Sequence, residues 1–229
     1  MCFKYLLLGH LLGDFTFQTD DIAENKTKQW RWNLCHSIIV TLSMLIFAIF
    51  FGPLIASLVI LNGVLHFVID YYKSKLSGAS PLNALTYFLA DQAVHLLIIF
   101  YISSFYNGNT LALPLKSELL DLLIILASIS SCASIFIQYT LRLFFVIDKN
   151  NFFFENEKIA GIMTRILIFL ILYSSIYFTD MILLVIITVL IAKTIYYRNK
   201  WHSLMIPAYF YSGLLMDLLI PSLIFCLVF

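Results

Sequence analysis

Long runs of apolar residues, separated by short polar segments, follow one another along the whole chain. A helix needs about 20 predominantly apolar residues to cross a bilayer, with a range of about 17–25. The segments that approach this length are residues 3–17, 34–51, 54–76, 82–106, 118–147, 159–178, 181–197 and 204–228. The first segment is short, which leaves open a spanning, a re-entrant or an interfacial helix. The pattern therefore predicts an all-α, polytopic bundle of about eight transmembrane helices.

Short turn sequences separate several of these predicted helices. Turn-forming residues occur as Gly-Pro at 52–53 and Asn-Gly-Asn at 107–109, and Phe-Thr-Asp at 178–180 makes a very tight connection. No soluble domain, long linker or convincing repeat interrupts the pattern. We therefore expect two four-helix halves, residues 1–106 and 107–229.

The composition supports a membrane environment. Hydrophobic residues make up 62% of the 229-residue chain, charged residues make up 12%, and the mean hydropathy is +0.94. A soluble domain is usually less than half apolar and about a quarter charged, so the lipid bilayer is the expected partner of most of the surface. The net charge of +1 provides no signal for nucleic acid. The four cysteines show no CxxC spacing, which argues against a disulfide framework.

Lysine and arginine residues predict the orientation, because cytoplasmic loops carry an excess of both. If all eight helices span, the basic residues near the connections fall on one side: Lys26, Lys28, Arg31, Lys73, Lys75, Arg142, Lys149, Lys158, Arg165, Lys193, Arg198 and Lys200. The opposite side has only Lys4 and Lys116. We therefore expect the basic side to be cytoplasmic and both termini to lie outside. A re-entrant first helix would change the side of the N-terminus alone.

Ionisable residues gather in the predicted helices of the first half, which holds four of the five histidines. Three of these histidines have an aspartate four residues away, a spacing that places both side chains on one helix face. The pairs are His10/Asp14, His66/Asp70 and Asp91/His95, and His36 lies near the start of the second helix. Such residues are costly inside a membrane and indicate a functional site by default.

The order within each pair predicts one layered site, because the histidine lies deeper and the aspartate nearer the cytoplasm in all three helices. Imidazole and carboxylate groups are common ligands of zinc, manganese and iron. The candidate metal ligands are His10, Asp14, His36, His66, Asp70, Asp91 and His95. Asp14, Asp70 and Asp91 are also the catalytic candidates, as orienting groups or as a general base. The candidate supporting residues are Gln18, Gln92, Lys26 and Lys73.

Other interpretations of the same residues remain open. The pairs are alternatively hydrogen-bond clamps between helices, each worth about 1 kcal/mol. They also suit a transporter that conducts protons or metal ions, or a non-catalytic membrane module that docks a partner. In the second half, Arg165 and Asp217 suggest an ion pair, Gln138 a clamp between helices, and His202 a residue of a basic loop.

Four motifs carry a resemblance to a known family. LLLGHLLGDFTFQTDDIAENK, CHS, LHFVIDYYKSKL and FLADQAVHLL follow one another in order over residues 5–100. They resemble the bacterial and phage-associated membrane family called domain of unknown function 3307. The family pattern matches His10, Gly13, Asp14, Gln18, Lys26, His36, His66, Asp70, Lys73, Asp91, Gln92 and His95. This resemblance implies a multi-pass protein of a bacterial cytoplasmic membrane.

The resemblance is weaker in the second half. The chain has Thr164-Arg165 and Ala208-Tyr209 where family members tend to carry Glu-Arg and Glu-Tyr pairs. The HxxxD spacing is also similar to that of membrane-bound metal-dependent hydrolases, zinc phospholipase C and zinc nucleases. The leading hypothesis is a metal-dependent hydrolase that uses a divalent ion, with zinc or manganese favoured. We expect it to act on a lipid-linked, phosphate-bearing or membrane-delivered substrate.

Overall fold

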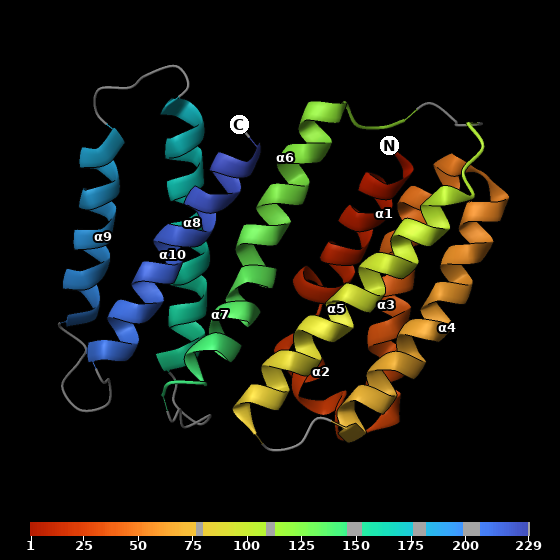
Figure 1. Cartoon of the computed structure of the whole chain (residues 1–229), viewed down its shortest axis with the longest axis horizontal. Helices are drawn as coiled ribbons and strands as arrows, with labels where there is room; N and C mark the ends of the chain where they lie inside the picture. The colour runs from red at the N-terminus through yellow and green to blue at the C-terminus, as the bar shows by residue number, and fades with distance from the viewer. Residues whose placement is uncertain (77–79, 109–112, 146–152, 176–181, 199–206, 229) are drawn as a thin grey trace. The chain divides into compact units, whose positions relative to one another are not determined.

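The computed structural model describes residues 1–76, 80–108, 113–145, 153–175, 182–198 and 207–228 (Figure 1). Its elements in the first part of the chain are α1 (Cys2–Leu11), the π-helical turn η1 (Leu12–Thr16), α2 (Asp20–Asn25), α3 (Trp30–Ala48), the 3₁₀ turn η2 (Ile49–Phe51), α4 (Pro53–Leu76), α5 (Pro81–Ser104) and α6 (Ser117–Ala127). There follow the π-helical turn η3 (Ser128–Cys132), α7 (Ala133–Leu141), α8 (Phe153–Ser175), α9 (Ile182–Arg198) and α10 (Pro207–Val228). No strand occurs in these ranges, which confirms the predicted all-α class.

Each of the eight predicted segments contains helix. Within the described ranges, five helices are long and apolar enough to cross a membrane: Trp30–Phe51, Pro53–Leu76, Pro81–Ser104, Ser117–Phe144 and Ala208–Val228. This is the pattern of a multi-pass membrane protein. A total of eight spans and the side of the termini stay predictions. The expected turn at 178–180, Asn109 and His202 lie outside the described residues.

Local sequence explains several helix ends. Thr19 precedes α2, and its hydroxyl accepts a hydrogen bond from the backbone N–H of Ile22 at 3.4 Å. Gly52 follows η2 with φ of +97°, a conformation that favours glycine, and Pro53 then begins α4. The turn predicted at 52–53 is therefore confirmed.

Contacts divide the chain into two compact units, Met1–Ser128 and Ile129–Phe229. This boundary lies later than the division near residue 106 that the sequence suggests, because α6 packs against α1. Lys4 Nζ lies 2.7 Å from an oxygen of Asp121, and the Tyr5 hydroxyl donates to the Leu115 carbonyl at 2.8 Å. These polar contacts join the segment after residue 106 to the N-terminal helix.

The first unit buries ionisable side chains in its interior and exposes many apolar side chains on its outer face. In this unit α1 packs against α3, α5 and α6, and α4 packs against both α3 and α5 (Figure 1). On α5, Leu97 is 67% exposed and Phe100 is 64% exposed, whereas His95 is 1% exposed. Apolar side chains on the outer face and ionisable ones inside suit a helix bundle surrounded by lipid.

The second unit packs α8 against α9 and α10, and α7 against both α8 and α10. Ile137, Leu141 and Tyr209 form a buried apolar cluster between α7 and α10. Arg165, Lys193 and Asp217 are also buried in this unit. The second unit therefore encloses charged groups as well as apolar ones.

Candidate metal centre

The histidines and aspartates predicted from the sequence come together inside the first unit. α1 and η1 carry His10 and Asp14, α3 carries His36, α4 carries His66 and Asp70, and α5 carries Asp91 and His95. All seven side chains are buried, with 6% exposure or less. The i,i+4 pairs thus share one interior, as their spacing predicts.

Four of these side chains bring ligand atoms especially close together. His36 Nε2 lies 3.0 Å from Asp14 Oδ1, 3.2 Å from His66 Nε2 and 3.5 Å from Asp70 Oδ2. His66 Nε2 lies 3.9 Å from the same oxygens of Asp14 and Asp70. Ligands about 2.0–2.1 Å from a tetrahedral zinc ion lie about 3.3–3.4 Å from one another. The distances that join His36 and His66 to each other and to each carboxylate are therefore close to the separation of ligand atoms around one zinc ion.

The deeper histidines extend this cluster. The ring centroid of His95 lies 4.3 Å from that of His66 and 5.3 Å from that of His10. Ligand atoms of His66, Asp70 and His95 lie within 4.8 Å of one another, as do those of Asp14, His36 and His66. His66 belongs to both groups, whereas His10 and Asp91 belong to neither. The structure thus brings five of the seven predicted ligands into two groups that could each hold a metal ion. His10 and Asp91 lie beside these groups.

Lysine side chains balance part of the negative charge. Lys26 Nζ lies 3.1 Å from both Asp70 Oδ2 and His36 Nε2. Lys73 Nζ lies 2.5 Å from Asp91 Oδ2 and 3.4 Å from Asp70 Oδ1. Three aspartates and two lysines leave one net negative charge when the imidazoles are neutral. This excess favours one further cation at the site.

The predicted glutamines differ in their contacts. Gln92 donates through Nε2 to Asp14 Oδ2 at 2.9 Å and to Asp91 Oδ2 at 3.3 Å, so it joins α5 to η1. The Gln18 side-chain oxygen is buried without a hydrogen-bond partner in the described structure. Gln92 therefore positions the carboxylate that faces His36, whereas Gln18 makes no such contact.

Several imidazole nitrogens lack hydrogen-bond partners in the described structure: Nδ1 of His10, His36, His66 and His95, and Nε2 of His10 and His95. His95 Nε2 lies 3.2 Å from Asp91 Oδ1, but the two atoms are not aligned for a hydrogen bond. Buried polar atoms are rarely left unpaired in folded proteins. These nitrogens indicate that a water, an ion or another ligand belongs among them.

Two glycines allow the first helix to approach α3 closely. A Cβ atom added at Gly9 would lie 2.7 Å from Met44 Cα, and one added at Gly13 would lie 2.6 Å from Val40 Cα. Small residues at membrane helix interfaces permit such close packing. The π-helical turn η1 follows at once and carries Asp14 toward His36, and π-helical turns often occur at functional sites.

Asn33 is a site residue that the sequence did not single out. It lies one turn before His36, is buried, and donates through Nδ2 to the Phe67 carbonyl at 3.0 Å. This bond fixes α3 to α4 directly beside His66. A polar residue three positions before a buried histidine was the available signal.

The comparison with protein families covers this unit. The family described as protein of unknown function (DUF3307) matches residues 2–124. The chain belongs to this family. The match confirms the resemblance and contains every candidate metal ligand of the first unit. No curated protein and no solved structure matches the chain.

Proposed function

We propose that this DUF3307 protein is a membrane-bound, divalent-metal-dependent hydrolase. The observation that carries the proposal is the buried group of Asp14, His36 and His66, one of two three-residue groups whose ligand atoms lie within 4.8 Å of one another. Asp14 Oδ1, His36 Nε2 and His66 Nε2 lie 3.0–3.9 Å apart in a cluster with an excess of negative charge. Zinc or manganese suits imidazole and carboxylate ligands. A divalent ion held here would supply Lewis-acid activation of water.

The remaining groups support a reaction at that position. Asp91 is held by Lys73 and lies beside His95, so it is the carboxylate best placed to accept a proton from water. His10 Nε2 lies 3.9 Å from Asp14 Oδ2, and Gln92 holds that oxygen with a hydrogen bond of 2.9 Å. Asp14, His36 and His66 as three protein ligands would leave the fourth position of a tetrahedral metal ion for a water molecule and the substrate.

Lys26 supports an anionic, phosphate-bearing substrate. Its ammonium contacts His36 Nε2 and Asp70 Oδ2, two atoms that a divalent cation would also use. Binding of a divalent ion would repel this ammonium and compensate the charge on Asp70. Lys26 would then be available to an anionic group. The apolar outer faces of α4 and α5 favour a lipid-linked or membrane-delivered substrate.

A proton relay is the second candidate, and one observation favours it. The rings of His36, His66, His95 and His10 follow one another with centroid separations of 5.2, 4.3 and 5.3 Å. Chains of histidine and aspartate also carry protons in pumps and transporters. Proton flux into vesicles without any bound metal would support this candidate.

The proposal is tested with the full chain reconstituted in phosphatidylcholine vesicles. The vesicles carry phosphatidylglycerol, phosphatidic acid or a polyprenyl diphosphate as probes. With zinc or manganese, we expect release of a water-soluble headgroup or phosphate from at least one probe. Release should stop with EDTA and with His66→Ala. Metal binding without any release would overturn the hydrolase while leaving the metal centre intact, and failure to bind metal would overturn both.

A further inference from the structure

A second buried charged cluster lies in the unit Ile129–Phe229. Arg165 on α8 is 2% exposed, Lys193 on α9 is 9% exposed, and Asp217 on α10 is 4% exposed. One oxygen of Asp217 accepts from Arg165 Nη1, and the other accepts from Lys193 Nζ. In the part of the chain that the structure describes, two cations thus share one carboxylate. The cluster carries one net positive charge inside the helix bundle.

Arg165 is held in place by a π-helical turn. Its Nε donates to the Ile129 carbonyl at 2.6 Å, and its Nη2 donates to the Ser130 carbonyl at 3.0 Å and to the Ser134 hydroxyl. Both carbonyls belong to η3. A guanidinium has five N–H donors, and these contacts together with Asp217 use four of them. Among the residues that the structure describes, one N–H on Nη1 and two N–H groups of Lys193 have no hydrogen-bond acceptor.

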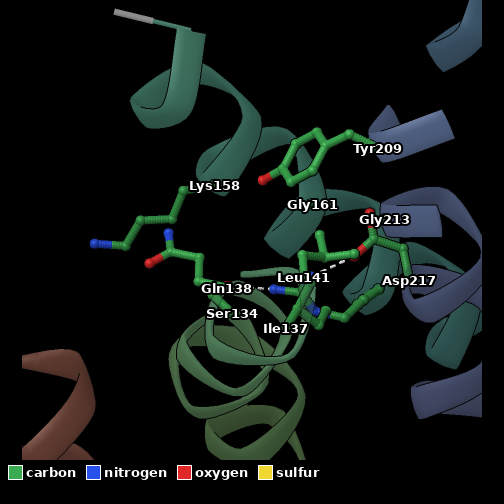
Figure 2. A pocket seen from close by; sticks show the side chains of 10 residues that line it. Ser134, Ile137, Gln138, Leu141, Lys158, Gly161, Tyr209, Gly213 and Asp217 are labelled. Atoms are coloured by element: carbon green, nitrogen blue, oxygen red, sulfur yellow. Dashed lines mark hydrogen bonds and ion pairs between the residues drawn. The ribbon is translucent and has the colours of Figure 1, made fainter. Parts of the chain in front are cut away.

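Space for a ligand lies beside this guanidinium. Figure 2 shows the side chains that line a cavity, among them Gln138 on α7, Gly161 on α8, and Tyr209, Gly213 and Asp217 on α10. The cavity has a volume of about 40 Å³. A cavity needs about 10–15 Å³ to hold one water molecule. This cavity is larger, so a small oxyanion fits. A Cβ atom at Gly161 would lie 3.0 Å from Arg165 Nη1. The missing side chain thus keeps the open face of the guanidinium accessible.

The cavity runs from helix ends toward the buried cluster. Leu141 is the last residue of α7, Tyr209 lies near the start of α10, and Lys158 lies in the first part of α8. Arg165 lies seven residues beyond Lys158, which corresponds to about 10 Å along the helix. A phosphate group that enters the cavity at the helix ends would therefore travel about 10 Å to contact Arg165.

We propose that this cavity binds a phosphate group, carried by a lipid headgroup or free as inorganic phosphate. An unbalanced positive charge is costly in a membrane interior, and an anion removes that cost. The Arg165 guanidinium lines the cavity, and a guanidinium is a preferred partner of phosphate oxygens. The amide of Gln138 adds a hydrogen-bond donor on the wall. This site is separate from the histidine cluster and does not depend on the hydrolase proposal.

Binding to the purified full chain tests the proposal with two probes. Inorganic phosphate is titrated in detergent, and phosphatidylglycerol is compared with phosphatidylcholine in nanodiscs by native mass spectrometry. Retention of phosphatidylglycerol would identify a lipid source, and binding of inorganic phosphate alone would identify a free anion. Both results support the site. Binding of neither probe by the wild type would overturn it.

Three substitutions then locate the bound phosphate. Lys193→Met keeps the Arg165–Asp217 pair but removes the excess charge, so affinity should fall about 10- to 100-fold. Asp217→Asn removes the competing carboxylate, so affinity should rise. Gly161→Ala changes no charge and fills space beside Nη1, so affinity should fall. The control Ser174→Thr adds one methyl group at the other end of α8. Unchanged phosphate affinity in both Lys193→Met and Gly161→Ala would overturn the proposal.

Discussion

The unit Met1–Ser128 buries three aspartates, two lysines and four histidines near one another, and six imidazole nitrogens there lack hydrogen-bond partners. The unit Ile129–Phe229 buries Arg165, Lys193 and Asp217, and each of these side chains has an ionic partner. Among the described residues, every buried side-chain nitrogen or oxygen without a hydrogen-bond partner belongs to the first unit.

The two units therefore stabilise buried polar groups differently: the second uses ion pairs, and the first leaves imidazole nitrogens without partners among the described residues. In the second unit, an ion pair with Asp217 and two backbone carbonyls hold Arg165, so loss of its side chain should primarily affect folding. In the first unit, four buried histidines with unpaired ring nitrogens lie beside three aspartates, so loss of these side chains should primarily weaken the binding of a metal ion. Substitutions in each unit should therefore change different measured quantities.

The largest expected effect is on stability in the second unit. Arg165→Ala leaves Asp217 with one cation and removes the donors to Ile129, Ser130 and Ser134, so it should lower the free energy of unfolding by about 3–5 kcal/mol. Thermal unfolding of the purified protein in one detergent measures this. Arg31→Ala, at an exposed position, is the matched control. Equal melting temperatures for Arg165→Ala and wild type would contradict the comparison.

Substituting a glycine in each unit tests the difference between the units without altering any proposed metal ligand. Gly13→Ala places a Cβ atom against the α3 backbone, and relief of that contact should move Asp14 away from His36. We expect a cost of about 1–3 kcal/mol, seen as weaker zinc binding. Gly161→Ala, the same change in the second unit, should leave zinc affinity unchanged. Isothermal titration of both variants decides this, and equal losses would indicate a general packing defect.

Asp91→Asn tests whether Asp91, which lies beside the two candidate ligand groups, is itself a metal ligand. Because Asp91 contacts His95 and Lys73 and belongs to neither three-residue ligand group, its neutralisation should weaken zinc binding about 10- to 100-fold without abolishing it. Competition with a chelator of known affinity measures the change. Asp121→Asn alters an exposed ion pair with Lys4 and serves as the control. Complete loss of zinc in Asp91→Asn would make Asp91 a direct ligand.

The smallest expected effect has the opposite sign. Lys26→Met removes an ammonium that contacts two proposed ligand atoms, so zinc affinity should rise about five-fold, which corresponds to about 1 kcal/mol. The same titration measures it, with Lys28→Met, two residues away and exposed, as the matched control. Weaker zinc binding in Lys26→Met would show that Lys26 supports the ion rather than competing with it.

Much of the site was predictable because its signals are local. Apolar runs of helical length predict the helices, and the i,i+4 spacing of His66 and Asp70 predicts a shared face whatever the helix packs against. A polar residue within an apolar run indicates an interior position, which is why His10 and His95 were identified. The contact between Arg165 and Asp217 follows the same logic and is confirmed.

The remaining features depend on contacts between distant segments. Lys193 also lies within an apolar run, but only the packing of α9 and α10 against α8 shows that it shares Asp217 with Arg165. The π-helical turn η1 has no clear sequence signal, since Gly13 and Asp14 fit an ordinary helix equally well. The packing of α6 on α1 joins residues more than 100 positions apart, which helical periodicity does not report.

The metal content of the purified protein tests the central claim most directly. Wild type, His66→Ala and the control His202→Ala are incubated with zinc at neutral pH, dialysed and analysed for metal. We expect about one zinc per chain in wild type and His202→Ala. His66→Ala should retain little, because His66 belongs to both ligand groups. Bound zinc should also decline below about pH 6, where free imidazole becomes protonated. A wild-type protein that binds neither zinc nor manganese, or a His66→Ala protein that binds zinc equally well, would contradict the account.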